Sequence, residues 1–311
     1  MEKAIIYGIG NKASENLGEI ENKYNIMAVS DSNSEKWGNV WYGYPVIEPA
    51  EINNYAYDWI LVPSFSFYHQ IFQELTSTYH IDAEKIRKSW NKGRAELDYW
   101  KTKISEELTL KNDHYKEILL CMAERENDSF MHGKVIADFG CGPRGSLAWT
   151  NSPAAKIGID VLALEYVKAA NTHNHGMIYL TSTETDIPIS NNTVDYMFTL
   201  NAFDRVSNPE RMICEIARVL KDSGEFIASF DLHQPEEEGQ PQWYTEQIID
   251  NLLKDKFCII SRRLAYSTGW AEPYKNMLDE KYETKINPDR QGYLWIRAKK
   301  IKKLCSTEEI I

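Results

Sequence analysis

A glycine-rich turn with an acid on either side lies in the middle of the chain. The string VIADFGCGPRGSL covers Val135–Leu147, and Asp160 follows Gly140 by 20 residues. Glycines at the end of an apolar run let the backbone approach a ligand closely, and a carboxylate that ends the next run can accept hydrogen bonds from a ribose diol. The spacing therefore predicts a strand, a turn and a helix that bind a nucleotide-like ligand.

The residues within this turn narrow the class of ligand. The turn lacks the GK[ST] of a P-loop, which binds phosphates and Mg²⁺. Gly140, Gly142 and Gly145 have the GxGxxG spacing, but Asp138 stands two residues before them. A carboxylate at that place is unfavourable beside a pyrophosphate and favourable beside an ammonium group, because of the sign of the Coulomb interaction. We therefore expect a ligand that is positively charged near the turn.

A related pattern opens the chain. Gly8, Gly10 and Ala13 follow the apolar run KAIIY, and Asp31 ends the next run, IMAVSD. The segment resembles the small Rossmann-like domains of bacterial sugar-modifying enzymes, which implies that the Gly8–Ala13 backbone and Asp31 bind a nucleotide or a nucleotide sugar. NAD is a second candidate ligand, and a structural or dimerising domain is a third interpretation. The segment offers no base for a hydride transfer, which disfavours a dehydrogenase.

Alternating strand and helix patterns must position both turns. Residues 1–90 run strand, helix, strand, turn, strand and helix, which predicts a small doubly wound α/β domain. Residues 91–132 have helical spacing without strand signals, and we interpret them as a helical connector that packs on the second domain. Residues 133–311 hold five strand–helix units and a final pair of strands. They predict a second α/β domain with a mostly parallel sheet, in which the last strand runs antiparallel.

The composition is that of a globular protein and disfavours several kinds of partner. The chain has 311 residues, enough for two domains, and no apolar run near the roughly 20 residues that span a bilayer. Its formal charge of −11 argues against a nucleic acid partner, because such binding needs clustered Lys and Arg. The N-terminus shows no signal peptide, and the five cysteines lack CxxC or Cys/His spacing. We expect a cytoplasmic protein with free thiols and no bound metal.

Four motifs around the central turn resemble one family. After VIADFGCGPRGSL come IGID, STETDIPISNNTVDYMFTLNAFDRV and ERMICEIARVLKDSGEFIASFDL, in this order. Together they make Gly133–Leu232, about a third of the chain, similar to the class I S-adenosylmethionine-dependent methyltransferases of the group called type 11. The resemblance implies S-adenosylmethionine as the cofactor and methyl transfer as the reaction.

The resemblance also assigns residues to parts of this cofactor. It implies that Asp138, Gly140 and Gly142 surround the methionine part. Asp160 would hold the ribose hydroxyl groups, and Leu162 would pack on the adenine.

Two further candidates come from the third and fourth motifs. The family places an acid before a Leu-Pro pair, where it meets the adenine amino group. Here Glu184 stands near that place, before Ile187 and Pro188, and is the candidate. Asn201, after the fourth strand, would line the cofactor near its sulfonium.

Two polar residues stand where the family binds its methyl acceptor, after the fourth and fifth strands. His233 in SFDLHQP and Asp204 in NAFDRV are the candidate catalytic residues, because a hydroxyl acceptor benefits from a base for its proton. Alternatively, His233 is a loop residue without a catalytic role, and Asp204 pairs with Arg205 or caps the helix that follows. Relatives often have Asp-His at this point, but this chain has Asp204 followed by Arg205. It therefore lacks the acid and histidine cluster with which some quinone methyltransferases hold a divalent metal.

The sequence as a whole predicts a cytoplasmic methyltransferase that modifies an oxygen of a sugar or glycan. Its N-terminal domain would recognise the nucleotide-linked or glycan part of the substrate, or form a homodimer. The enzymatic alternative is N- or O-methylation of a small secondary metabolite. The non-enzymatic alternative is a regulatory protein that uses both nucleotide-type folds as sensors or as a scaffold.

Overall fold

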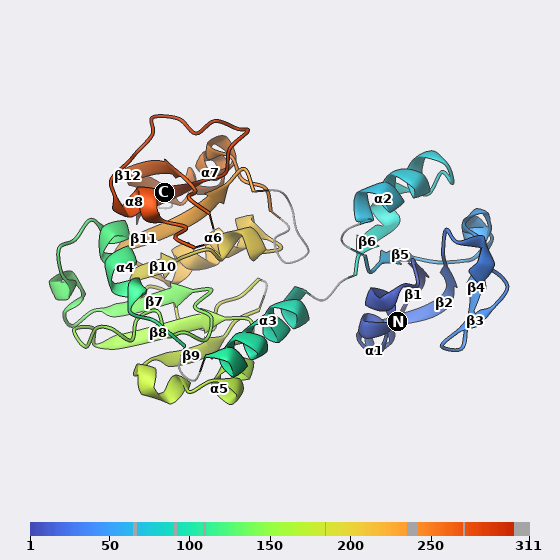
Figure 1. Ribbon diagram of the computed structural model, residues 1–311, viewed down its shortest axis with the longest axis horizontal. Coiled ribbons are helices and arrows are strands. Elements are labelled where there is room, and N and C mark those ends of the chain that lie inside the picture. The colour runs from blue at the N-terminus through green and yellow to red at the C-terminus, as the bar shows by residue number, and fades with distance from the viewer. Residues whose placement is uncertain are drawn as a thin grey trace, which may run out of the picture. The chain divides into compact units, whose positions relative to one another are not determined.

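The computed structural model describes residues 1–64, 67–89, 92–107, 110–183, 185–234, 242–269 and 271–301. The chain divides into two units, Met1–Arg94 and Ala95–Ile311. Figure 1 shows each unit as a sheet with helices around it. The segment expected as a helical connector therefore belongs almost entirely to the second unit. Within the described ranges, no helix combines the length and the apolar character needed to cross a membrane.

The first unit has a six-stranded sheet in the order β3-β4-β2-β1-β5-β6, parallel except for the β3–β4 hairpin. Its elements are β1 (Glu2–Tyr7), α1 (Asn11–Lys23), β2 (Tyr24–Ser30), β3 (Val40–Trp41), β4 (Tyr44–Ile47), β5 (Trp59–Val62), α2 (Tyr68–Ser77) and β6 (Ile86–Lys88). Because β1 lies between β2 and β5, the strand order reverses beside it, where sheets of this kind usually bind ligands.

Different helices cover the two faces of this sheet. Ile6 of β1 packs with Ala13 and Leu17 of α1, whereas Tyr7 packs with Leu75 of α2. Successive side chains of a strand point to opposite faces, so the continuous apolar run of β1 is buried on both. The predicted doubly wound arrangement is confirmed for this unit.

The second unit has a seven-stranded sheet in the order β12-β13-β11-β10-β7-β8-β9. Its elements are α3 (Lys92–Glu106), which begins at the unit boundary, α4 (His114–Ala123), β7 (Val135–Phe139), β8 (Ala155–Asp160), α5 (Ala163–Ala169), β9 (Ile178–Thr181), β10 (Val194–Thr199), α6 (Pro209–Val219), β11 (Leu220–Leu232), α7 (Glu246–Leu253), β12 (Phe257–Tyr266), α8 (Lys275–Leu278) and β13 (Gly292–Lys300). Strand β13 is antiparallel to both β11 and β12, which confirms the predicted antiparallel last strand.

Helices cover both faces of this sheet too. Met212 of α6 and Ile249 of α7 belong to the core on one face, and Leu119 of α4 belongs to the core on the other. Helix α6 ends at Val219, because Leu220 takes extended backbone angles and begins β11. The strand order reverses between β7 and β10, which places the central glycine turn at the reversal.

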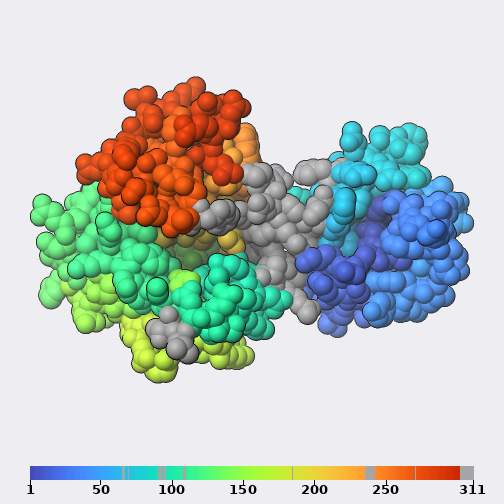
Figure 2. Space-filling model, viewed as in Figure 1, coloured from blue at the N-terminus to red at the C-terminus, as the bar shows by residue number. Residues whose placement is uncertain are grey.

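Polar contacts tie the C-terminal strands to α4. Arg297 of β13 pairs with Glu124, and Arg263 of β12 donates a hydrogen bond to the carbonyl oxygen of Cys121. In Figure 2 the red and orange C-terminal residues accordingly lie against the green residues around α4. These contacts fix the last strands, including the residues of β13 that flank the end of β11.

Candidate functional site

The central glycine turn is held between two neighbouring strands. The Gly140 N–H donates a hydrogen bond to the carbonyl oxygen of Ile159 on β8, with 2.7 Å between nitrogen and oxygen. On the other side, a Cβ added to Gly140 would lie 2.1 Å from the Cβ of Ala202, and Gly140 has φ +75°. Any side chain at this position would strain the backbone and displace the segment after β10. Glycine is therefore required here by packing as well as by conformation.

Asp160 ends β8 and anchors the turn with its carboxylate. Its Oδ2 accepts a hydrogen bond from the Gly142 N–H at 3.2 Å, and its Oδ1 accepts one from the Leu162 N–H at 2.9 Å. Burial raises the pKa of Asp160 to about 6, although both N–H groups oppose the shift. Each carboxylate oxygen can accept a second hydrogen bond, so the pair could also bind two hydroxyl groups. The structure thus brings Gly142, Asp160 and Leu162 together.

Asp138 lies on β7 just before the turn and is buried. Ser146 donates a hydrogen bond to its Oδ2, while its buried Oδ1 has no hydrogen-bond partner among the described residues. Burial raises the pKa of Asp138 to about 7; the Ser146 hydrogen bond opposes this shift and the Asp160 charge adds to it. Two neighbouring buried carboxylates with raised pKa values would be stabilised in their ionised forms by a positively charged ligand.

Asn201 follows β10 on the other side of the turn. It has φ +51°, and within the described ranges its buried Oδ1 finds no donor. A left-handed asparagine with an unsatisfied oxygen is costly, and a donor from a ligand would reduce that cost. Since the next residue, Ala202, packs on Gly140, Asn201 lies near the turn. Glu184, the candidate for the adenine amino group, lies outside the described residues.

Helix α3 covers the turn, which the sequence patterns did not predict. The Trp100 ring lies 3.5 Å from the place where a Cβ on Gly142 would stand. Arg144 of the turn makes a bidentate ion pair with Glu107, which follows α3, at 2.9 and 3.0 Å. The helical spacing of apolar residues predicts which side of α3 is buried. It does not predict that this side packs against the glycine turn.

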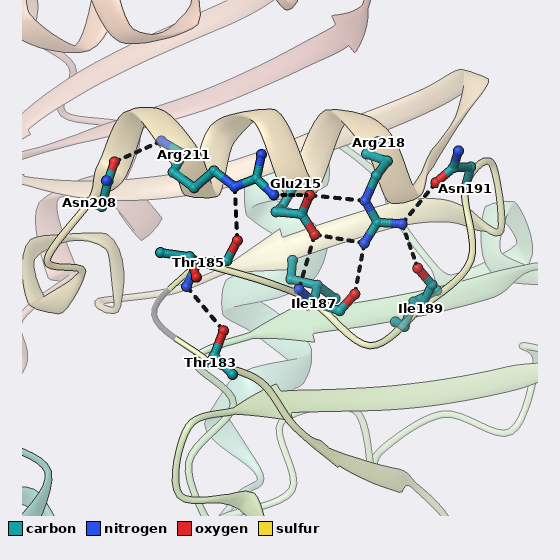
Figure 3. Close-up of polar contacts among 9 residues, drawn as sticks. All are labelled: Thr183, Thr185, Ile187, Ile189, Asn191, Asn208, Arg211, Glu215 and Arg218. Carbon is teal, nitrogen blue, oxygen red and sulfur yellow. Dashed lines mark hydrogen bonds and ion pairs between the residues drawn. The ribbon is translucent and has the colours of Figure 1, made fainter.

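An ion-pair network fixes the loop between β9 and β10, and Figure 3 shows its members. Glu215 of α6 accepts a hydrogen bond from the Ile187 N–H at 3.1 Å and pairs with Arg218, whose Nη2 lies 2.6 Å from its Oε2. Arg218 in turn donates to the carbonyl oxygens of Ile187 and Ile189. The Glu and Arg of EIARVLKDSG thus hold the loop in which the adenine contact is expected.

Two acids stand at the carboxyl ends of β10 and β11. Asp204 is buried in a single 3₁₀ turn, and Asp231 is the penultimate residue of β11. The capping alternative for Asp204 is wrong, because the Asn208 side chain caps α6. Asp231 was not predicted from the sequence, although an acid at a strand end was the signal that identified Asp160. No group of three or more metal-binding side chains occurs in the described part of the chain.

His233 has a protein partner at each ring nitrogen. Its Nδ1 lies 3.2 Å from the carbonyl oxygen of Pro288, and its Nε2 lies 3.3 Å from Oε2 of Glu246 on α7. Its side chain is only 4% exposed. This environment suits a histidine that links the end of β11 to α7, and it favours Asp231 over His233 as the residue that meets an acceptor.

The turn of the first unit differs in charge from the central one. Gly8, Gly10 and Ala13 form the passage from β1 into α1, where the Ala13 N–H donates to the Gly10 carbonyl oxygen. Asp31 accepts a hydrogen bond from a backbone N–H of this turn at 3.0 Å and pairs with Lys36 at 2.7 Å. Burial raises the pKa of Asp31, but the Lys36 ammonium and backbone N–H groups lower it by more. A lysine beside a glycine turn suits an anionic ligand such as a phosphate.

Two family models match the chain. Residues 137–228 match the model described as a methyltransferase domain, and residues 1–87 match the model described as C2185-like, N-terminal. No curated protein matches the chain. The methyltransferase match includes Asp138, the glycine turn, Asp160 and the Glu215 network, and it favours an enzyme over a sensor or scaffold.

Several solved structures are similar to the chain. A Haloferax volcanii methyltransferase in complex with the Trm112 methyltransferase activator is 17% identical, with a TM-score of 0.49, and the match covers 68% of this chain and 98% of that one. An S-adenosylmethionine-dependent methyltransferase from Aquifex aeolicus is 20% identical, with a TM-score of 0.39, and the match covers 53% of this chain and 82% of that one. Similarities at this level of sequence identity show a shared fold and nothing more.

Proposed function

We propose that this S-adenosylmethionine-dependent methyltransferase transfers its methyl group to a hydroxyl oxygen of a sugar or glycan; residues 137–228 match the methyltransferase domain model. The observation that carries the proposal is the pair of buried acids at the turn. Asp138 and Asp160 have pKa values raised to about 7 and about 6, so their ionised forms need a positive partner. S-adenosylmethionine, with a sulfonium and an amino group, has the charge that this site lacks.

In this proposal each site residue meets one part of the cofactor. Asp138, Gly140 and Gly142 surround the methionine part, supported by the unsatisfied Oδ1 of Asp138. Asp160 accepts hydrogen bonds from the ribose hydroxyl groups with the lone pairs that the backbone leaves open. Leu162 is then next to the adenine.

Two residues complete the proposed cofactor site. Asn201, whose Oδ1 lacks a donor among the described residues, would lie near the sulfonium. Glu184, which lies outside the described residues, would meet the adenine amino group. The Glu215 network holds Ile187 and Ile189, which follow it in the chain.

The affinity for the cofactor should fall in acid. A positively charged ligand binds the ionised form of Asp138. Because Asp138 must lose one proton before binding, the affinity should fall about tenfold for each pH unit below its pKa of about 7. The dissociation constant should therefore be nearly constant above about pH 7.5 and rise steeply below about pH 6.5. Calorimetry across this range measures the slope.

The control for this prediction is Asp138→Asn, which removes the titrating group at nearly the same size. It should bind weakly at every pH and show a flatter slope. A slope as steep as that of the natural protein would assign the effect to another group.

The hydroxyl acceptor is supported by the residues beyond the cofactor site. Carboxylates and tyrosine rings gather at the ends of β10 and β11 and on β13, where Asp231 pairs in register with Tyr293. Carboxylates accept hydrogen bonds from sugar hydroxyl groups, and aromatic rings pack on sugar faces. Methylation of a small secondary metabolite remains the second candidate, because it would use the same groups.

The first unit is proposed to bind the nucleotide-linked or glycan part of the substrate. The glycine turn, Asp31 and the Lys36 ammonium support a phosphate-bearing ligand. A nucleotide sugar that binds here should stabilise the unit by about 2.7 kcal/mol when its free concentration is about 100 times its dissociation constant. Thermal-shift measurements with nucleotide sugars and NAD test this, and Asp31→Ala should abolish the shift. A panel without any shift would favour a structural or dimerising role.

The proposed reaction is tested with labelled cofactor. Transfer of the labelled methyl group from S-adenosylmethionine to members of a panel of sugars and nucleotide sugars should give an alkali-stable methyl ether. If only amine-bearing metabolites are labelled, the metabolite alternative replaces the sugar.

A further inference from the structure

Asp231 lies just beyond residues 137–228, which match the methyltransferase model. It pairs in register with Tyr293 of β13. Its Oδ1 is buried, and none of the described residues donates a hydrogen bond to it. Leaving a buried carboxylate oxygen without a donor costs its desolvation, so a hydrogen-bond donor from a ligand would be favourable at this oxygen.

Asp231 interacts electrostatically with four ionisable groups from three segments. They are Asp204 and Arg205 from the 3₁₀ turn after β10, Tyr274 from the segment before α8, and Tyr293 from β13. Burial and then the negative charge of Asp204 raise the pKa of Asp231 well above its ordinary value, and Arg205 opposes the shift. Asp231 is thus a stronger base than an exposed carboxylate.

Aromatic residues make the surroundings of Asp231 rigid. The rings of Tyr274 and Tyr293 are 4.6 Å apart, and those of Tyr274 and Trp295 are 5.5 Å apart. Trp295 donates a hydrogen bond to Oγ of Ser229, two residues before Asp231 on the same face of β11. A carboxylate fixed beside packed rings is partly shielded from water, which strengthens its interaction with a bound hydroxyl group.

Asp231 lies at the same edge of the sheet as the cofactor site. Strand β11 is parallel to β10, and β10 is parallel to β7, which leads into the glycine turn. Neighbouring strands are about 4.8 Å apart, so the lines of β11 and β7 are separated by about 10 Å. The segment with Asn201 and Asp204 leaves β10 between them. An acceptor at Asp231 would therefore be next to the proposed cofactor site.

We propose that Asp231 is the catalytic base of the methyl transfer and that Asp204 is a positioning residue whose charge acts on it. This inference rests on the proposed function, transfer to a hydroxyl oxygen. When bound, the cofactor supplies the methyl group, and the electron pair of the methyl–sulfur bond remains on sulfur. The acceptor oxygen forms the new bond to carbon, and Asp231 takes the proton of that oxygen on Oδ1. The products are the methyl ether, S-adenosylhomocysteine and protonated Asp231, which returns its proton to solvent.

The first test compares Asp231→Asn with the natural enzyme, using a hydroxyl acceptor from the sugar panel. The natural kcat should rise about tenfold per pH unit up to an inflection above the ordinary carboxyl range. Asp231→Asn should lower kcat by about 10²–10⁴-fold and remove the inflection, with cofactor affinity unchanged within about twofold. Asp222→Asn makes the same change at an exposed position of β11 and should leave the profile unchanged.

The second test is Asp204→Asn. Because this variant removes a negative charge near Asp231, the inflection should move to lower pH. A merely structural role for Asp204 would lower kcat at every pH and leave the inflection in place. Titration of the ¹³C-labelled carboxyl of Asp231 by NMR, in the full chain with S-adenosylhomocysteine, gives the same comparison without an acceptor.

The outcomes separate this inference from the proposed function. If Asp231→Asn keeps the natural kcat on a hydroxyl acceptor, or if Asp231 titrates in the ordinary carboxyl range, Asp231 is not the base. If the natural enzyme methylates no hydroxyl acceptor, the proposed function fails first, and the base inference falls with it.

Discussion

Replacement of Asp160 by alanine is expected to weaken S-adenosylmethionine binding by about 100-fold or more. Its carboxylate accepts hydrogen bonds from the Gly142 and Leu162 N–H groups and is proposed to accept two more from the ribose. Hydrogen bonds to a charged group contribute about 1.5–3 kcal/mol each, so the two ribose bonds alone give about 3–6 kcal/mol. Each 1.4 kcal/mol changes the dissociation constant about tenfold. Calorimetry near pH 8 measures the change while the natural Asp160 is ionised.

A graded series separates loss of contact from loss of structure. Asp160→Asn keeps one acceptor oxygen for the backbone and should bind better than Asp160→Ala. Glu165→Ala removes an acid from the first turn of α5 and should change the dissociation constant by less than about threefold. If Asp160→Ala binds the cofactor as the natural protein does, the ribose assignment is wrong.

The strand pattern was predictable because both sheets are mostly parallel. Parallel strands buried on both faces are continuous apolar runs, such as VIA before Asp138 and IGI before Asp160. The chemistry of the turn was also local, since Gly140, Gly142 and Asp160 lie within one strand–turn–strand unit. The helix predicted directly after the turn was wrong, because residues 141–154 form turns and loops that lead from β7 into β8. Here the sequence spacing alone fixes which groups meet.

The acceptor side was less predictable because its contacts join distant segments. Asp231 lies beside Tyr293 only because β13 pairs with β11 in antiparallel fashion. The register of that pairing cannot be predicted from the sequence of either strand alone. The family resemblance instead pointed to His233, which is the next titratable residue after Asp231 along the chain. In the structure its ring nitrogens are 3.2 Å from Pro288 and 3.3 Å from Glu246, contacts that depend on two later segments.

The position of α3 over the glycine turn was difficult to predict for the same reason. The segment 91–132 was predicted to be helical, but an amphipathic pattern gives only the side of a helix that is buried. The contacts of Trp100 with Gly142 and of Glu107 with Arg144 require the final placement of α3 on the second unit. No local signal in either segment specifies that placement.

Replacement of Glu215 by alanine is expected to destabilise the second unit by about 3–5 kcal/mol. The Glu215 side chain is 3% exposed, pairs with Arg218 and accepts the Ile187 N–H. Removal of one partner from a buried ion pair leaves the other charge uncompensated, which is the origin of a loss of this size. The Ile187 N–H would also lose its acceptor. Urea denaturation at neutral pH measures the change in unfolding free energy.

The pH dependence of this loss identifies its origin. Arg218 holds the pKa of Glu215 below its ordinary value, so the stabilisation is present above the ordinary carboxyl pKa and is lost as the pH falls through the lowered one. The difference between the natural protein and Glu215→Ala should therefore be constant near neutrality and shrink in acid. Glu215→Gln, which keeps the shape but not the charge, should lie between them.

The same substitution connects stability with cofactor binding. Because the network holds the loop of Ile187 and Ile189, in which the adenine contact is expected, Glu215→Ala should also raise the dissociation constant of S-adenosylmethionine at temperatures where it remains folded. Glu210→Ala, at an exposed position in the first turn of α6, is the matched control and should change stability by less than about 1 kcal/mol. A Glu215→Ala protein as stable as this control would mean that the loop is held by packing alone.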